Sequence, residues 1–156
     1  MAYPFSTGWG AYFVPNIPLA TTDAGVMQEV DIGASSADHG EIVCTRPCQI
    51  KRLGFVLTGE AASGTTTAPT VIFTKRPTPL SATSEAVVGT LTIPSGTAIG
   101  KVVYKDVTPV SMTPGDSLEI SHTVGVGTPT GQGHWFIEVE DDPEYAANVS
   151  DMVESA

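Results

Sequence analysis

The amino-acid sequence predicts an all-β protein, an antiparallel β-sandwich or jelly-roll of about eight strands that follows an extended N-terminal arm. Two observations lead to this prediction. Several short segments alternate apolar and polar residues with period 2, as strands that bury one face do. Sixteen glycines and twelve prolines, spread over 156 residues, supply turns between these segments. The chain is also long enough to form one domain with a substantial core.

Residues 1–24, MAYPFSTGWGAYFVPNIPLATTDA, are predicted to form the arm. The chain has two Trp, four Tyr and five Phe residues, and five of them lie in this segment: Tyr3, Phe5, Trp9, Tyr12 and Phe13. The prolines and glycines between them make a helix implausible. A proline-broken segment cannot bury its own aromatic side chains, so it lies either on the sheet of its own domain or against another subunit. The sequence leaves both possibilities open and makes these five the candidate partner-binding residues.

Residues 25–143 are predicted to form the sandwich domain, and residues 144–156 an acidic C-terminal tail. Alternation predicts strands over 26–32, 41–44, 48–59, 70–76, 85–93, 101–107, 117–124 and 134–140. In segment 48–59, Leu53, Phe55 and Leu57 share one face, which we expect to line the core. Segment 70–76 has apolar residues on both faces, which is typical of a strand that is central in its sheet or covered at an interface.

The last predicted hairpin carries the clearest local signals. Pro114-Gly115 predicts a type II turn, because proline fixes φ at the first central position and glycine accepts a positive φ at the second. The closing strand, HWFIEVE, alternates between residues expected inside (Trp135, Ile137, Val139) and outside (Phe136, Glu138, Glu140). His122, on an apolar strand face, is expected to be a hydrogen-bonded core residue.

Three further stretches are predicted to connect strands. Residues 60–69 (EAASGTTTAP) and 125–134 (GVGTPTGQGH) are rich in small residues and lack a packing pattern, so both are expected to be loops. Arg46-Pro47 is expected to turn the chain between Cys44 and Cys48. Two cysteines do not make a disulfide framework, and this pair could bridge the turn or remain as two thiols; a cytosolic route of synthesis favours thiols.

The net charge of −10 lies entirely in the last third of the chain. Residues 1–105 hold seven basic and seven acidic residues, whereas residues 106–156 hold ten acidic and no basic ones. Such a chain is repelled by nucleic acids and by anionic membranes. It also lacks a signal-peptide pattern and an apolar run long enough to span a bilayer. We therefore expect no nucleic-acid partner and no membrane partner.

The segment HWFIEVEDDPEY raises the question of a catalytic or metal site, because five of its last eight residues are acidic. Alternation places the first two carboxylates on the outer face, and the glycine-centred pattern of an EF-hand is absent. Three signatures of catalytic or nucleotide sites are also absent: H-E-x-x-H, G-x-S-x-G and a phosphate-binding Gly-Lys motif. We therefore expect an acidic outer surface, with no catalytic residue, no metal site, no cofactor and no enzymatic activity.

The layout of the whole chain resembles the small virion structural proteins of tailed bacteriophages, especially capsid decoration or cement proteins. The resemblance rests on an arm that begins MAYPFSTGWGAYF, on the sandwich hairpin TPGDSLEI, and on loops rich in Gly, Thr and Pro. It implies a homotrimer or ring, made in the host cytoplasm, that sits on the outer capsid surface and clamps neighbouring copies of the major capsid protein. The alternative is a carbohydrate-binding or receptor-binding β-sandwich module of a tail or surface protein.

Overall fold

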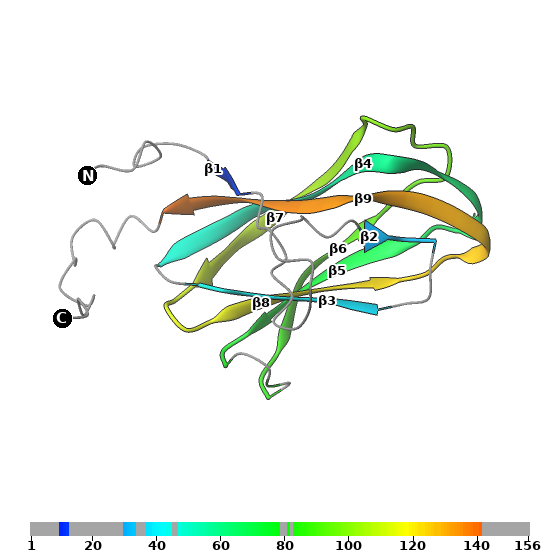
Figure 1. Ribbon diagram of the computed structural model, residues 1–156. Coiled ribbons are helices and arrows are strands. Elements are labelled where there is room, and N and C mark those ends of the chain that lie inside the picture. Colours follow the sequence, from blue (N-terminus) through cyan, green and yellow to red (C-terminus); the bar gives the residue numbers. More distant parts are fainter. Residues whose placement is uncertain are drawn as a thin grey trace, which may run out of the picture.

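The computed structural model describes residues 10–12, 30–33, 37–44, 47–78, 81 and 83–141. This part of the chain contains nine strands and no helix. The strands form two antiparallel sheets that face each other as the layers of a sandwich (Figure 1). The predicted all-β fold, an antiparallel β-sandwich, is therefore confirmed.

The larger sheet has five strands, and long strands form its centre. It contains β1 (Gly10–Tyr12), β2 (Val30–Asp31), β4 (Cys48–Thr67), β7 (Val102–Met112) and β9 (Val126–Asp141). The order is β1-β9-β4-β7, and β2 also pairs with β9. The smaller sheet contains β3 (Ala37–Val43), β5 (Thr70–Arg76), β6 (Ala86–Thr92) and β8 (Ser117–Thr123), in the order β3-β8-β5-β6. The prediction of a central strand over 70–76 is confirmed by the position of β5.

The core lies between the two sheets. The larger sheet contributes the predicted inward residues of β4 and β9, namely Leu53, Phe55, Leu57, Trp135, Ile137 and Val139, all of them buried. The smaller sheet contributes Val71, Phe73, Leu118 and Ile120, and the predicted core residue His122 is buried beside them. The rings of Phe73 and Trp135 meet edge to face across the core, with centroids 6.5 Å apart. This contact joins the two layers, because the two rings come from opposite sheets.

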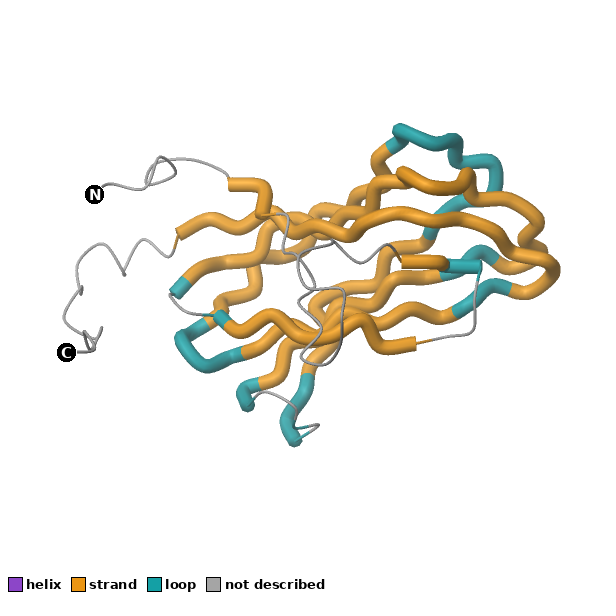
Figure 2. The backbone as a smooth tube through the Cα atoms, in the orientation of Figure 1, coloured by secondary structure: helices purple, strands orange, loops and turns teal. Residues whose placement is uncertain are grey.

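The prediction of loops over 60–69 and 125–134 is wrong for most of both segments. β4 continues to Thr67 and β9 begins at Val126, and the two strands pair with each other there, from Glu60 opposite Gln132 to Thr67 opposite Val126. Figure 2 shows both as continuous strands that turn together around one end of the sandwich. The register shifts repeatedly along this stretch, which is the signature of β-bulges. Bulges bend strands, so they account for the curvature.

Glycine makes this bent ribbon possible. Gly64 has a φ of +71°, which side-chain-bearing residues rarely adopt, and a Cβ there would lie 2.0 Å from the Thr128 carbonyl oxygen. The small residues that obscured the strand pattern in the sequence therefore allow the two backbones to approach. The turn at Pro114-Gly115 is confirmed: Gly115 has a φ of +95°, and the Asp116 N–H donates to the Thr113 carbonyl oxygen over 2.9 Å.

Candidate functional site

The N-terminal segment provides the first part of the candidate site. Of the five aromatic residues predicted to bind a partner, Tyr12 lies in β1, while Tyr3, Phe5, Trp9 and Phe13 lie outside the described residues. β1 pairs antiparallel with β9, from Gly10 opposite Val139 to Tyr12 opposite Ile137. The sequence left open whether the arm lies on the sheet of its own domain or against another subunit. Residues 10–12 pair with the sheet of their own chain.

A second segment, β2, pairs with the same edge of β9, and a buried side chain follows it. Val30 pairs with Gly133, and the fully buried Ile32 follows directly. The Ile32 N–H donates to the Gly131 carbonyl oxygen over 2.9 Å, and a Cβ on Gly131 would lie 2.8 Å from the Ile32 side chain. β2 is therefore fixed by a side chain in the core. The attachment that the structure describes for β1 is a three-residue backbone ladder.

The first two carboxylates of the acidic segment, Glu138 and Glu140, lie on the outer face of the larger sheet and are ion-paired; Asp142 and Glu144 lie outside the described residues. Glu138 and Glu140 point away from the core as predicted, because Ile137 and Val139 between and beside them are buried. The Arg52 guanidinium lies 3.2 Å from Glu138, and the Lys51 ammonium lies 2.9 Å from Glu140. Among the described residues, no three His, Cys, Asp or Glu side chains are arranged to hold a metal ion.

Arg52 organises the centre of this face. Its Nε lies 2.6 Å from Asp106, and its guanidinium carbon lies 4.5 Å from the centre of the Tyr104 ring. The hydrogen bond to Asp106, together with the charges of Glu138 and Asp106, raises the pKa of Arg52 above its ordinary value. Arg52 therefore stays charged and ties β4 to both of its neighbours, β7 and β9.

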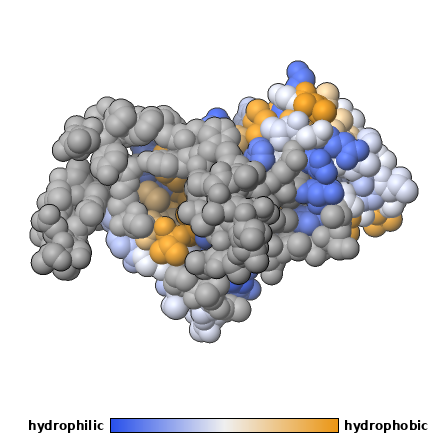
Figure 3. All heavy atoms as spheres, viewed as in Figure 1, coloured by the Kyte–Doolittle hydropathy of each residue, from blue (hydrophilic) through white to orange (hydrophobic). Residues whose placement is uncertain are grey.

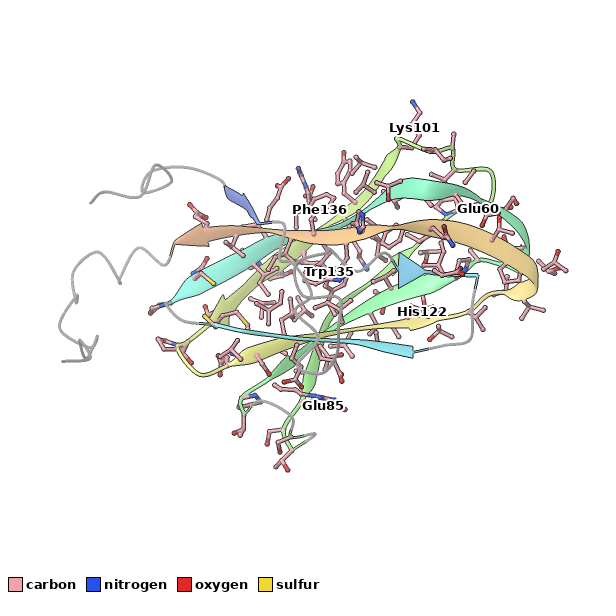
Figure 4. The ribbon with its side chains drawn as sticks, in the orientation of Figure 1. Glu60, Glu85, Lys101, His122, Trp135 and Phe136 are labelled. Atoms are coloured by element: carbon pink, nitrogen blue, oxygen red, sulfur yellow. The ribbon has the colours of Figure 1, made fainter. Side chains whose placement is uncertain are left out.

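Phe136 shares this outer face, as the sequence predicted. Its ring lies across Gly54 on the neighbouring strand, where a Cβ would stand 2.0 Å from the ring (Figure 4). Gly54 therefore makes room for an aromatic side chain that would otherwise project from the sheet. Trp135 and Phe136 point to opposite sides of β9, one into the core and one onto the outer face.

Three apolar side chains are exposed at the β7 end of the larger sheet: Ile99, Val102 and Tyr104. We refer to these three residues as the β7 patch. Apolar atoms gather at the top of the view in Figure 3, over the loop that precedes β7. Scattered exposed apolar residues are normal on protein surfaces. Three of them between residues 99 and 104, at the start of the edge strand β7, make a candidate contact surface. Sequence alternation alone did not single them out.

The smaller sheet carries a second arginine cluster that the sequence did not predict. Glu41 and Glu119 stand directly opposite each other on β3 and β8, a pairing of like charges that is unfavourable by itself. Arg76, on β5, contacts both of them, at 2.5 Å and 2.8 Å, and also contacts Glu85 at 3.3 Å. The hydrogen bond to Glu41 and the charge of Glu119 raise the pKa of Arg76. Arg76 thus places one positive charge between the two carboxylates and reduces their mutual repulsion.

One end of the sandwich is closed by a polar contact between the sheets. Lys75 follows Val71 and Phe73 on the inward face of β5. Its Nζ donates to the Ser111 carbonyl oxygen of the larger sheet over 2.8 Å. The same Nζ lies 2.9 Å from the buried Asp116 carboxylate. Burial opposes ionisation of Asp116, but hydrogen bonds from Thr113 and from Lys75 outweigh it and hold its pKa below the usual value. Asp116 is therefore charged at neutral pH and fixes the β7–β8 turn.

No model of a known protein family, no curated protein sequence and no solved structure matches this chain. The described residues also contain no helix that could cross a bilayer. Function must therefore be inferred from the chain's own surfaces, of which the arm-bearing edge of β9 and the β7 patch are the principal ones.

Proposed function

We propose that the protein is a non-enzymatic virion structural protein, a capsid decoration or cement protein that stabilises a phage head by bridging major capsid subunits. Its partners are the major capsid protein and further copies of itself, assembled as a homotrimer on the outer capsid surface. The observation that carries the proposal is the attachment of the N-terminal arm. Gly10–Tyr12 adds as a short strand to the open edge of β9, next to a segment that contains Tyr3, Phe5 and Trp9.

Strand addition offers a simple means of assembly. A three-residue ladder contributes few hydrogen bonds, so the same β9 edge can accept β1 from a sister subunit at little cost. The aromatic residues of the arm then bury against the neighbouring subunit or the coat. Each large aromatic side chain buried in this way contributes about 1.5–3 kcal/mol before the cost of ordering the arm. Repetition over many sites on one particle multiplies modest contacts into substantial stability.

Charge and exposed surface support the same assignment. The whole net charge of −10 lies in residues 106–156, and an outer capsid face suits such a chain better than a face turned towards packaged DNA. The β7 patch supplies a second apolar contact on the folded body, at the opposite edge of the larger sheet from β1. Two separate contact surfaces are what a protein needs to bridge neighbouring subunits.

The test compares the thermal stability of capsids decorated with the full chain, with a chain lacking residues 2–14, or with one lacking residues 144–156. The two deletions have equal length, so the tail deletion is a matched control for loss of a terminal segment. We expect the full chain and the tail deletion to raise the temperature at which capsids rupture, and the arm deletion to abolish that gain. Unchanged heat resistance after arm deletion would contradict the arm mechanism.

A carbohydrate-binding or receptor-binding module is the second candidate, and one observation favours it. Tyr104 is an aromatic side chain of β7 that is 58% exposed, with the Arg52 guanidinium lying 4.5 Å from the centre of its ring. Exposed aromatic faces of this kind stack on sugar rings. A glycan array probed with the full chain and with Tyr104→Ala tests this function: binding that disappears in the variant would favour it over the cement role.

A further inference from the structure

Cys44 and Cys48 lie where the chain passes from one sheet to the other. β3 ends at Val43 in the smaller sheet, and β4 begins at Cys48 in the larger one. The two Sγ atoms are 4.0 Å apart, and both side chains are half-buried against the rim of the core. A disulfide needs an S–S distance of about 2.05 Å, so the sulfurs must approach by about 2 Å.

The backbone at both cysteines is held by contacts that do not involve the sulfurs. The Cys44 N–H donates to the Asp116 carbonyl oxygen over 2.7 Å, and its own carbonyl oxygen accepts from the Gly115 N–H over 2.9 Å. Cys48 is flanked on both sides in the larger sheet, by Met112 of β7 and Asp141 of β9. The fold therefore keeps the two thiols together whether or not they are bonded.

We propose that Cys44 and Cys48 are a redox-modification site, a dithiol that a disulfide oxidant such as oxidised glutathione closes into a bond between the ends of the two sheets. The proposal is independent of the cement function. One cysteine thiolate attacks a sulfur of glutathione disulfide, whose S–S bond breaks and releases one glutathione thiolate. The second cysteine thiolate then attacks the protein sulfur of the mixed disulfide, forms the Cys44–Cys48 bond and releases the second glutathione. Two electrons reduce the glutathione disulfide, and the two cysteine protons end on the two glutathione thiols.

The bond strengthens an edge of the sandwich. Among the described strands, β3 pairs with β8 alone, and it carries Glu41 of the Arg76 cluster. Closing a loop between Cys44 and Cys48 restricts the unfolded chain and ties the end of β3 to the start of β4. By thermodynamic linkage, the fold favours the disulfide by the same factor by which the disulfide favours the fold. We expect oxidation to raise the Tm by about 5 °C.

The test equilibrates the full chain with defined mixtures of reduced and oxidised glutathione, once in native buffer and once in concentrated guanidinium chloride. After acid quenching and alkylation, mass spectrometry gives the fraction of each redox form. The expected product is a monomer lighter by two hydrogen atoms. We expect the equilibrium constant for forming the Cys44–Cys48 disulfide from glutathione disulfide to be about tenfold or more larger in the native protein than in the denatured one. The variants Cys44→Ser and Cys48→Ser should form only a mixed disulfide with glutathione. The proposal is overturned if this equilibrium constant in the native protein is equal to or below that in the denatured protein. It is also overturned if the native product is mainly an intermolecular dimer or a doubly glutathionylated chain.

Discussion

Two arginines bind carboxylates on the two outer faces of the sandwich, and their surroundings differ. Arg52, on the larger sheet, has a side chain that is 32% exposed, and its partner Asp106 is 67% exposed. Arg76, on the smaller sheet, is 16% exposed, and its partners Glu41 and Glu119 are 8% and 14% exposed. Water competes for the first set of charges but reaches the second set poorly. Both clusters are arginine–carboxylate ion pairs, but we expect removal of the arginine to reduce the stability of the fold far more at Arg76 than at Arg52.

The difference follows from strand position. β5 is flanked by strands on both sides, so Arg76 lies among residues from three neighbouring segments. Arg52 faces Asp106, which lies on the edge strand β7 and is open to solvent. Two facing glutamates that are largely buried are strongly destabilised when their counter-charge is removed, whereas exposed ion pairs contribute little to stability. Burial therefore makes the Arg76 cluster a structural element and the Arg52 cluster a feature of the surface.

The largest effect is expected from Arg76→Met. The substitution removes the guanidinium that contacts both Glu41 and Glu119, and we expect the free energy of unfolding to fall by about 2–4 kcal/mol. Urea denaturation followed by tryptophan fluorescence measures the change. The triple variant Arg76→Met, Glu41→Gln, Glu119→Gln also removes the two facing negative charges and should recover part of the loss. An Arg76→Met variant as stable as the parent would show that the cluster is not structural.

An effect of intermediate size is expected from removing the Asp116 carboxylate, which contacts Lys75 at one end of the sandwich, and this effect should depend on pH. The pKa of Asp116 is lowered in the folded protein, so the folded chain binds this proton less readily than the unfolded chain does. The stabilisation is complete above the unfolded pKa of about 3.9 and is lost as the pH falls through the lower folded value. We expect Asp116→Asn to cost about 1–2 kcal/mol at pH 7. The cost should shrink as unfolding is measured at successively lower pH below about 4; a cost independent of pH would contradict the assignment.

The smallest effect is expected from Arg52→Met, which makes the same substitution as Arg76→Met on the exposed face. We expect a change in urea midpoint several times smaller than that of Arg76→Met. The effect of Arg52→Met should fade further in about 1 M NaCl, because salt screens exposed charges far more than buried ones. Equal losses from the two variants would show that burial does not distinguish the clusters.

Much of the fold could be predicted from local patterns. The inward faces of β4 and β9 and the turn at Pro114-Gly115 follow from alternation and from the φ preferences of proline and glycine, and the structure confirms them. The pairing of 60–67 with 126–132 could not be predicted, because small residues without alternation give no strand signal. Its determinant is close backbone approach at Gly64 and Gly127, between segments more than sixty residues apart.

The candidate site was less predictable than the fold. Alternation placed Glu138 on the outer face, but its partner Arg52 lies 86 positions earlier in the chain, and a single sequence does not reveal such pairs. The same holds for Arg76 and Glu41, which are 35 positions apart. The aromatic arm was identified from composition alone, and of its five aromatic residues only Tyr12 lies within the described part of the chain. Its role in assembly remains a prediction of the sequence.

The most direct test of the cement proposal is the molar mass of the purified protein in solution, measured by light scattering after size exclusion. The full chain and the chain lacking residues 2–14 should be measured at matched concentrations. The proposal predicts that the full chain elutes at three or more times the 16.2 kDa of one subunit and that the deletion lowers this mass. A full chain that stays monomeric at every concentration, or an oligomer that the deletion leaves unchanged, would contradict it.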